Sequence, residues 1–168
     1  MEEKEEFVLP EEENPLAGQI NCCPNIKLNL SGVITELGTN IAKSRFVITP
    51  DMLVDEEGLA NSGFVFNAAT YVAQAVLNVS NTMVMSSKVA FFAPAKLGDI
   101  IEFEATSKLS NLRKREVKVV GTLREIKIFE GIFQVVASDE HILKINEDEL
   151  AKQEKIRKRE AKERRASA

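Results

Sequence analysis

Before residue 58, two stretches of the chain alternate between apolar and polar residues, as strands with one buried face do. Residues 26–37 read IKLNLSGVITEL and predict a strand that breaks at Gly32 and can resume after it. Residues 41–49 predict a second strand, which stops at the turn signal TPD. A long, acidic and glycine-containing loop follows.

After residue 81 the alternation returns and predicts the rest of a sheet. The runs TMVMSSKVAFF, IIEFEATSKLS and REVKVVGTLREIKIFEGIFQVVA are separated by a Pro/Gly turn at APAKLGD and by a reversal at Asn111. Residues 125–127 are the expected hairpin within the last run, and Gly131 is a candidate bulge. In total the pattern predicts five or six antiparallel strands.

Between the two groups lies an uncharged stretch, GLANSGFVFNAATYVAQAVLN, at residues 58–78. Apolar side chains occur on most sides of it, which predicts a buried helix whose first turn is capped by Asn61 or Ser62. Four polar residues interrupt the apolar ones: Asn67, Thr70, Gln74 and Asn78. At 100° per residue they fall in one stripe about 80° wide.

One buried helix wrapped by five to six antiparallel strands is an α+β arrangement, which we expect over residues 26–145. Residues 1–25 are rich in Glu and Pro and lack periodicity, so they predict an acidic mobile arm. Residues 146–168 contain strong helix formers, acids first and bases last, and predict a charged helical tail.

Charge is concentrated in these two tails. Residues 1–13 hold seven Glu and one Lys, residues 152–165 carry a net charge of +5, and residues 14–145 are neutral. A neutral body argues against direct DNA binding, while the basic tail is either a solvated helix or an arm that contacts a partner, nucleic acid or acidic lipid. No run is apolar enough for a membrane span and the acidic start is unlike an export signal, so we expect a cytoplasmic protein.

Few residues suit catalysis. His141 is the single histidine and follows the last predicted strand, where we expect a surface residue. Cys22 and Cys23 are adjacent, a spacing that rarely closes a disulfide and does not match a metal-ligand pair, so we expect bystander thiols rather than a redox pair. Zinc-ligand spacings, a P-loop and a G-x-G-x-x-G motif do not occur, and we expect no metal or cofactor.

The start of the predicted helix offers another chemistry. Gly63, beside the capping residues, lets a group approach the amides of the first turn, which suit a carbonyl or thioester oxygen. Alternatively, Gly63 only permits close packing, and the polar stripe forms hydrogen bonds across a symmetric subunit contact. The residues alone leave both interpretations open.

The order of these motifs resembles the hotdog fold over roughly residues 26–143. The features that carry the resemblance are the helix start G-x-x-N-S-G, the turn FFAPAKLGD and the final run IFEGIFQVV. They look like PaaI-type acyl-CoA thioesterases, the malonyl-CoA-binding effector domain of FapR repressors, and hotdog virulence proteins co-regulated with flagella in Campylobacter and its relatives. The resemblance implies a homodimer, or a dimer of dimers, that holds acyl-CoA between subunits in fatty acid metabolism.

The same resemblance locates a thioesterase site from which this sequence departs. The pattern H-G-G at the helix start falls on Asn61, Ser62 and Gly63, and the catalytic acid falls on Thr70, so only Gly63 is kept. A threonine hydroxyl does not replace a carboxylate that activates water, and residues 58–98 contain no Asp or Glu. We expect the ligand pocket to persist without its catalytic acid.

The candidate ligand-binding residues are Asn61, Ser62, Gly63, Asn67, Thr70, Lys88, Arg113 and Lys114. Gly63, Asn67 and Thr70 are expected to face the ligand, and the three cations are candidates for the phosphates of coenzyme A. Gln74 and Asn78 are expected to be structural.

These residues favour a non-catalytic protein that binds acyl-CoA or an acyl-carrier protein and acts as a sensor or regulator. One alternative is an acyl-CoA thioesterase with a degenerate site, in which Asn61 and Thr70 position water or in which Glu56 or Glu57 enters from the loop. A second alternative is a dimeric interaction scaffold that recruits partners through its two tails.

Overall fold

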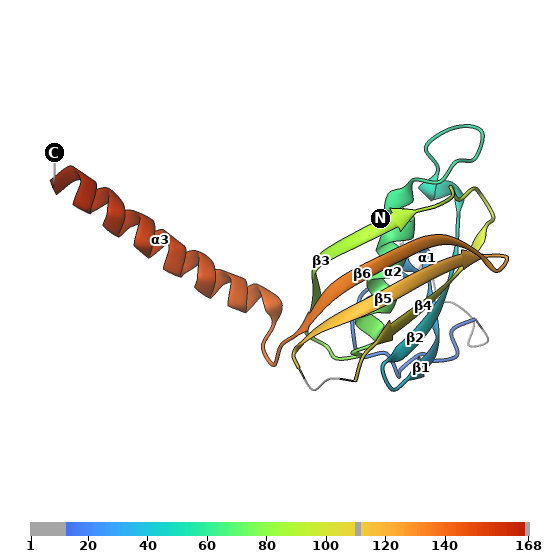
Figure 1. Cartoon of the computed structure of the whole chain (residues 1–168), viewed down its shortest axis with the longest axis horizontal. Helices are drawn as coiled ribbons and strands as arrows, with labels where there is room; N and C mark the ends of the chain where they lie inside the picture. Colours follow the sequence, from blue (N-terminus) through green and yellow to red (C-terminus); the bar gives the residue numbers. More distant parts are fainter. Residues whose placement is uncertain (1–12, 110–111, 167–168) are drawn as a thin grey trace, which may run out of the picture. The chain divides into compact units, whose positions relative to one another are not determined.

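The computed structural model describes residues 13–109 and 112–166 (Figure 1). Two compact units make up the chain: the first runs to Ala137 and the second begins at Ser138.

The first unit contains one antiparallel sheet in the order β1-β2-β4-β5-β6-β3. Its strands are β1 (Val33–Gly38), β2 (Ile41–Val47), β3 (Thr82–Phe91), β4 (Ile100–Ser107), β5 (Lys114–Leu123) and β6 (Ile126–Ala137). β1 and β3 form the two edges of the sheet. This arrangement confirms the predicted α+β class with five to six antiparallel strands.

Helix α2 (Ser62–Ala75) packs against all six strands, and the sheet curves around it (Figure 1). Alternate residues of each central strand point at the helix, as the buried positions of β4 show. Phe129 lies between the rings of Phe103 and Phe133, with ring centroids 5.9 Å and 6.5 Å away. The ring of Phe66, from α2, lies 5.9 Å from that of Phe133 and joins the helix to this aromatic cluster.

The hairpin between β5 and β6 lies one residue earlier than predicted. Its turn residues are Arg124 and Glu125, which have φ angles of 50° and 66°, as a two-residue turn of type I′ requires. The predicted bulge at Gly131 is wrong, because Gly131 pairs regularly with both neighbouring strands. Instead, a Cβ atom at Gly131 would lie 2.6 Å from the ring of Phe133, so the glycine makes room for an aromatic side chain.

The first part of the strand predicted over residues 26–37 is a short helix, α1 (Leu28–Ser31). Its last turn is held by Asn67, whose Nδ2 donates to the Leu30 carbonyl at 2.9 Å and to Ser31 Oγ at 2.8 Å. Gly32 follows with a φ of +86° and breaks the segment as predicted, before β1 begins. Leu28 and Leu30 pack against the core from this helix. Their spacing of two residues is the same as that of buried residues in a strand, so the sequence pattern alone did not separate the two structures.

Residues 13–25 differ from the predicted mobile arm, because they pack against the core. Leu16 and Ile20 contact it, and Cys22 is completely buried. The side chain of Asn78 holds this segment: its Nδ2 donates to the Gln19 carbonyl at 2.9 Å, and its Oδ1 accepts from the amide of residue 21 at 2.7 Å. The remainder of the predicted arm, residues 1–12, lies outside the described residues.

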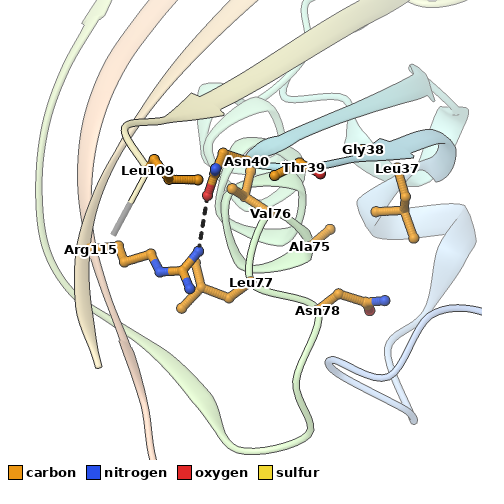
Figure 2. Close-up of a pocket in the computed structure, with 10 residues that line it drawn as sticks. All are labelled: Leu37, Gly38, Thr39, Asn40, Ala75, Val76, Leu77, Asn78, Leu109 and Arg115. Carbon is orange, nitrogen blue, oxygen red and sulfur yellow. Dashed lines mark hydrogen bonds between the residues drawn. The ribbon is translucent and has the colours of Figure 1, made fainter. Parts of the chain in front are cut away.

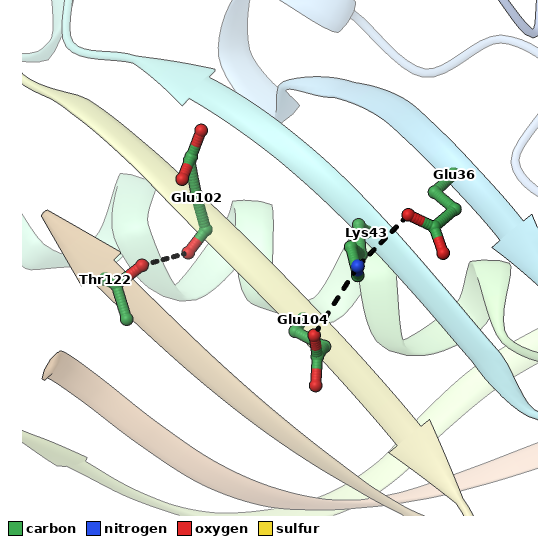
Figure 3. A network of polar contacts seen from close by, with 5 residues as sticks. All are labelled: Glu36, Lys43, Glu102, Glu104 and Thr122. Carbon is green, nitrogen blue, oxygen red and sulfur yellow. Dashed lines mark hydrogen bonds and ion pairs between the residues drawn. The ribbon is translucent and has the colours of Figure 1, made fainter. Parts of the chain in front are cut away.

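The face of the sheet that points away from α2 is charged (Figure 3). Lys43 lies between Glu36 and Glu104, with Nζ to oxygen distances of 3.1 Å and 3.8 Å. These pairs are solvent-exposed and contribute little to stability. The charged side chains keep this face hydrated, so the opposite, apolar face of the sheet is the one that packs on α2.

The second unit contains helix α3 (Ile142–Ala166), which begins four residues before the predicted tail helix. His141 precedes it and its Nδ1 accepts a hydrogen bond from the Leu143 amide at 3.2 Å, so the single histidine caps the helix. Ion pairs such as Lys158 with Glu154 support the exposed helix. No helix within the described ranges is long and apolar enough to cross a membrane.

Candidate functional site

A groove with a volume of about 550 Å³ opens at the start of α2. We call it the N-terminal groove. Its walls come from the loop before the helix, the first turn of the helix and the segment after β3: Val54, Leu59, Ala60, Asn61, Ser62, Val65, Phe91, Phe92, Ala93, Pro94 and Ala95. Its size lies within the range of about 300–1,000 Å³ that is typical of small-molecule sites.

Asn61 is the N-cap of α2, as predicted. Its backbone is extended, and its side-chain Oδ1 accepts a hydrogen bond from the Gly63 amide at 2.8 Å. Ser62 is the first helical residue, so its amide has no acceptor inside the helix. The positive end of the helix dipole and this amide favour an oxygen with partial negative charge in the groove.

Asn67 and Thr70 are not among the residues that line the N-terminal groove. The amide of Asn67 holds α1, and the Thr70 hydroxyl donates to the Asn67 carbonyl at 2.7 Å. Gln74 donates from Nε2 to both the carbonyl and the hydroxyl of Thr82 at 3.1 Å. Asn78 holds residues 19–21. The four polar side chains of the stripe therefore form hydrogen bonds within their own chain, and these bonds do not require a second subunit.

The predicted phosphate-binding cations lie in two different places along the sheet. Lys88 is exposed on β3, three residues before the Phe91 that lines the groove. Lys114 pairs with Val136, and Val136 pairs with Met83 at the opposite end of β3. One protomer therefore does not bring Arg113 and Lys114 to the N-terminal groove.

None of the residues that line the groove is an Asp, Glu or His. Glu56 and Glu57 are exposed on the loop that contributes Val54 and Leu59 to the wall. Within the part of the chain that the structure describes, no group of three or more His, Cys, Asp or Glu residues is arranged to hold a metal ion. The groove can bind and orient a polar oxygen beside an apolar group, but its lining supplies no general base.

Sequence reasoning found the helix start but missed the aromatic wall opposite it. Phe91 is 44% exposed and Phe92 is 57% exposed, and the Lys127 ammonium lies 5.5 Å from the centre of the Phe92 ring. A cation over an aromatic face is favourable and holds the ring in place. The available signal was the pair of aromatic residues that directly precedes the turn APAKLGD.

A curved antiparallel sheet around one central helix, with a groove at the start of that helix, defines a hotdog-fold protein. The sigma28-regulated virulence protein Cj0977 from Campylobacter jejuni is similar to this chain, with 44% identity and a TM-score of 0.74. The match covers 76% of this chain and 98% of that one. The chain therefore belongs to the same family of hotdog proteins, and the predicted resemblance is confirmed.

A more distant likeness is to a hypothetical thioesterase from Streptococcus pneumoniae whose crystal structure contains coenzyme A. The two chains are 14% identical, with a TM-score of 0.57 over 64% of this chain and 86% of that one, which shows a shared fold alone. No known family model matches the chain.

Among curated proteins, methylthioribose-1-phosphate isomerase from Aquifex aeolicus is 32% identical over 111 residues. The match covers 66% of this chain but 24% of the isomerase, so the chain spans about a quarter of the length of that relative.

Proposed function

We propose that this protein binds an acyl-CoA, or the acyl group of an acyl-carrier protein, without hydrolysing it, and that it acts as a cytoplasmic sensor or regulator. The observation that carries the proposal is the composition of the N-terminal groove. It combines the Asn61 cap and the Ser62 amide with the apolar walls of Phe91 and Phe92, and its lining contains no acid or histidine. Such a site recognises a thioester oxygen and lacks the group that would activate water.

A second copy of the chain completes the proposed site. β3 is a ten-residue edge strand that pairs only with β6 among the described strands, and it exposes Met85 and Phe91. A long edge strand has unpaired backbone groups that favour pairing with another strand. Two-fold antiparallel pairing of β3 with its counterpart makes a continuous sheet across a homodimer.

This pairing explains the separated cations. Antiparallel pairing places the start of one β3 beside the end of the other. Lys114 lies two strands from Met83, about 10 Å at the usual strand spacing, so the Lys114 and Arg113 of a second copy approach the groove of the first. Lys88 of the first copy is exposed three residues before Phe91, and together these cations suit the phosphates of coenzyme A. The S. pneumoniae hotdog protein that contains coenzyme A supports the choice of ligand.

Isothermal titration of the protein with acetyl-CoA, malonyl-CoA and a long-chain acyl-CoA tests the proposal. We expect binding below the millimolar range, together with no release of free thiol from any of the three. The Lys114→Gln variant should bind more weakly, and the matched variant Lys144→Gln, in helix α3, should bind like the parent protein. Absence of binding by the parent protein below the millimolar range would refute the proposal.

A degenerate thioesterase is the second candidate, because the loop that carries Glu56 and Glu57 also forms part of the groove wall through Val54 and Leu59. A change of loop conformation could bring a carboxylate to the thioester. Hydrolysis of any acyl-CoA by the parent protein, lost in Glu56→Gln or Glu57→Gln, would support the enzyme in place of the binding protein. No turnover across the panel would eliminate it.

A further inference from the structure

Arg115 points into the body of the protein at the far end of α2 (Figure 2). On β5, Val117 and Val119 are buried against the helix, and Arg115 belongs to the same face by the alternation of the strand. Its neighbours Lys114 and Glu116 point outward and are exposed. An arginine at an inward position is unusual, because its charge stays on at all physiological pH values.

The guanidinium group of Arg115 is only partly satisfied. One of its terminal nitrogens donates to Asn40 Oδ1 at 3.2 Å, whereas its Nε is buried and has no hydrogen-bond partner. No carboxylate forms an ion pair with Arg115 within residues 13–109 and 112–166. A buried, charged donor without a partner is costly, so its presence calls for an explanation.

A cavity of about 400 Å³ lies directly in front of this group. We call it the Arg115 pocket. Leu37, Val76 and Leu77 provide apolar walls, and Leu109, which is 84% exposed, stands at its side (Figure 2). The pocket therefore combines one orphaned cationic donor with a lining that is partly aliphatic and partly polar, a composition that suits an anion with a short apolar tail.

Asn40 holds the arginine in a fixed orientation. Asn40 occupies the turn between β1 and β2 with a φ of +60°, a conformation that asparagine adopts more readily than most residues. Its carbonyl accepts a hydrogen bond from the Ser107 amide at 2.9 Å, which ties this turn to the end of β4. The guanidinium is thus positioned before any ligand arrives, as an efficient binding site requires.

We propose that the Arg115 pocket binds a monocarboxylate with a short aliphatic tail. The planar guanidinium matches a carboxylate in a bidentate arrangement, and the tail lies against the leucine and valine walls. The C-terminal end of α2 lies at the same pocket and carries the negative part of the helix dipole, which opposes a multiply charged anion such as a phosphate more strongly than a singly charged one. A singly charged carboxylate is therefore the favoured ligand.

This site is separate from the N-terminal groove. The 14 residues of α2 separate the two by roughly 20 Å at 1.5 Å per residue. The inference rests on Arg115 and its surroundings and holds whether or not the groove binds a thioester.

Titration of isotope-labelled protein with octanoate, followed by NMR, tests the inference. We expect shifts of the backbone amides of Asn40, Val76 and Leu77, with no shift at Ser62. Octanamide, which has the same shape without the charge, should bind at least tenfold more weakly. Equal affinity for octanamide and octanoate, or shifts confined to the N-terminal groove, would overturn the proposal.

Variants separate binding from folding. Arg115→Gln should lose octanoate affinity by tenfold or more while still binding acyl-CoA like the parent protein, and Arg45→Gln, an exposed arginine, should change neither. Arg115→Met should raise the melting temperature, because it removes an unpaired buried donor from an apolar setting. If Arg115→Gln does not fold, Asn40→Ala keeps the arginine and removes its orienting oxygen. Octanoate affinity unchanged in the folded variant would contradict the proposal.

Discussion

The two ends of helix α2 present opposite chemistry. At the start of the helix, the Asn61 cap and the Ser62 amide face aromatic walls, and the backbone amides of the first turn create a positive potential there. At the end of the helix the dipole is negative, and Arg115, which β5 supplies, is the cationic side chain among the described residues that line the pocket. A sheet wrapped around a helix closes the sides of the helix and leaves its two ends as the places where ligands can reach the interior.

Both ends depend on the aromatic cluster that fixes the helix on the sheet, so its removal should have the largest effect. Phe133 is completely buried and contacts the rings of Phe66 and Phe129. We expect Phe133→Ala to lower the free energy of unfolding by about 3 to 5 kcal/mol and to weaken both sites together. Denaturant unfolding measures this, and Leu109→Ala, at an exposed position, should change stability by less than about 0.5 kcal/mol. If Phe133→Ala weakened ligand binding at one site and left the other unchanged, the two sites would not both depend on the aromatic cluster.

The C-terminal end of α2 has a specific anchor in Asn78. Asn78→Ala removes both hydrogen bonds to residues 19–21 and places alanine at a φ of 46°. We expect a loss of about 1 to 3 kcal/mol and faster reaction of the buried Cys22 with a thiol reagent. Asn25→Ala, at an exposed asparagine of the same segment, is the control. A Cys22 that stays protected in Asn78→Ala would show that the core contacts alone hold residues 13–25.

The N-terminal end can be altered in charge without altering its cap. Asn61→Asp keeps an oxygen that accepts from the Gly63 amide and adds a negative charge, so we expect stability to rise by about 0.3 to 1 kcal/mol while acyl-CoA binding weakens. Asn61→Ala should cost roughly 1 kcal/mol through loss of the cap. Thermal unfolding and calorimetric titration measure the two effects. Tighter binding of acyl-CoA by Asn61→Asp would show that the N-terminal groove does not bind the thioester oxygen.

The smallest expected effect concerns the charges around the aromatic wall. Lys127 and Lys118 form hydrogen bonds with Glu130 that lower the pKa of its carboxyl group. Because the folded pKa is below the unfolded one, the stabilisation is complete above the unfolded pKa of about 4.3 and is lost as the pH falls through the folded value. The melting temperatures of the parent protein and Glu130→Gln should therefore differ near neutral pH and converge in acid. If the two curves of melting temperature against pH stayed parallel down to the lowest pH, the stabilisation would not come from the Glu130 carboxylate. Glu125→Gln is the control.

Much of the fold could be predicted from local sequence patterns, and the segments that were predicted wrongly have physical causes. The sheet and the buried helix followed from period-two alternation and from an uncharged run with polar residues at helical spacing. The segment before Gly32 became a helix because Asn67, 37 residues away from Leu30, supplies its hydrogen bonds. Such a tertiary contact leaves no trace in the local pattern, and the packing of residues 13–25 under Asn78 has the same origin.

At the two sites as well, some features follow from the local sequence and others from tertiary contacts. The sequence by itself determined a cap at Asn61 or Ser62, the absence of an acid in residues 58–98, and hence a helix start without a catalytic carboxylate, because these depend on residue types at fixed local spacings. Only the tertiary structure decided that Phe91 and Phe92 face that cap, that Lys114 on β5 is level with the opposite end of β3, and that Arg115 turns inward beside Asn40. Strand register and sheet curvature set these neighbours, and both arise from contacts between residues far apart in the chain.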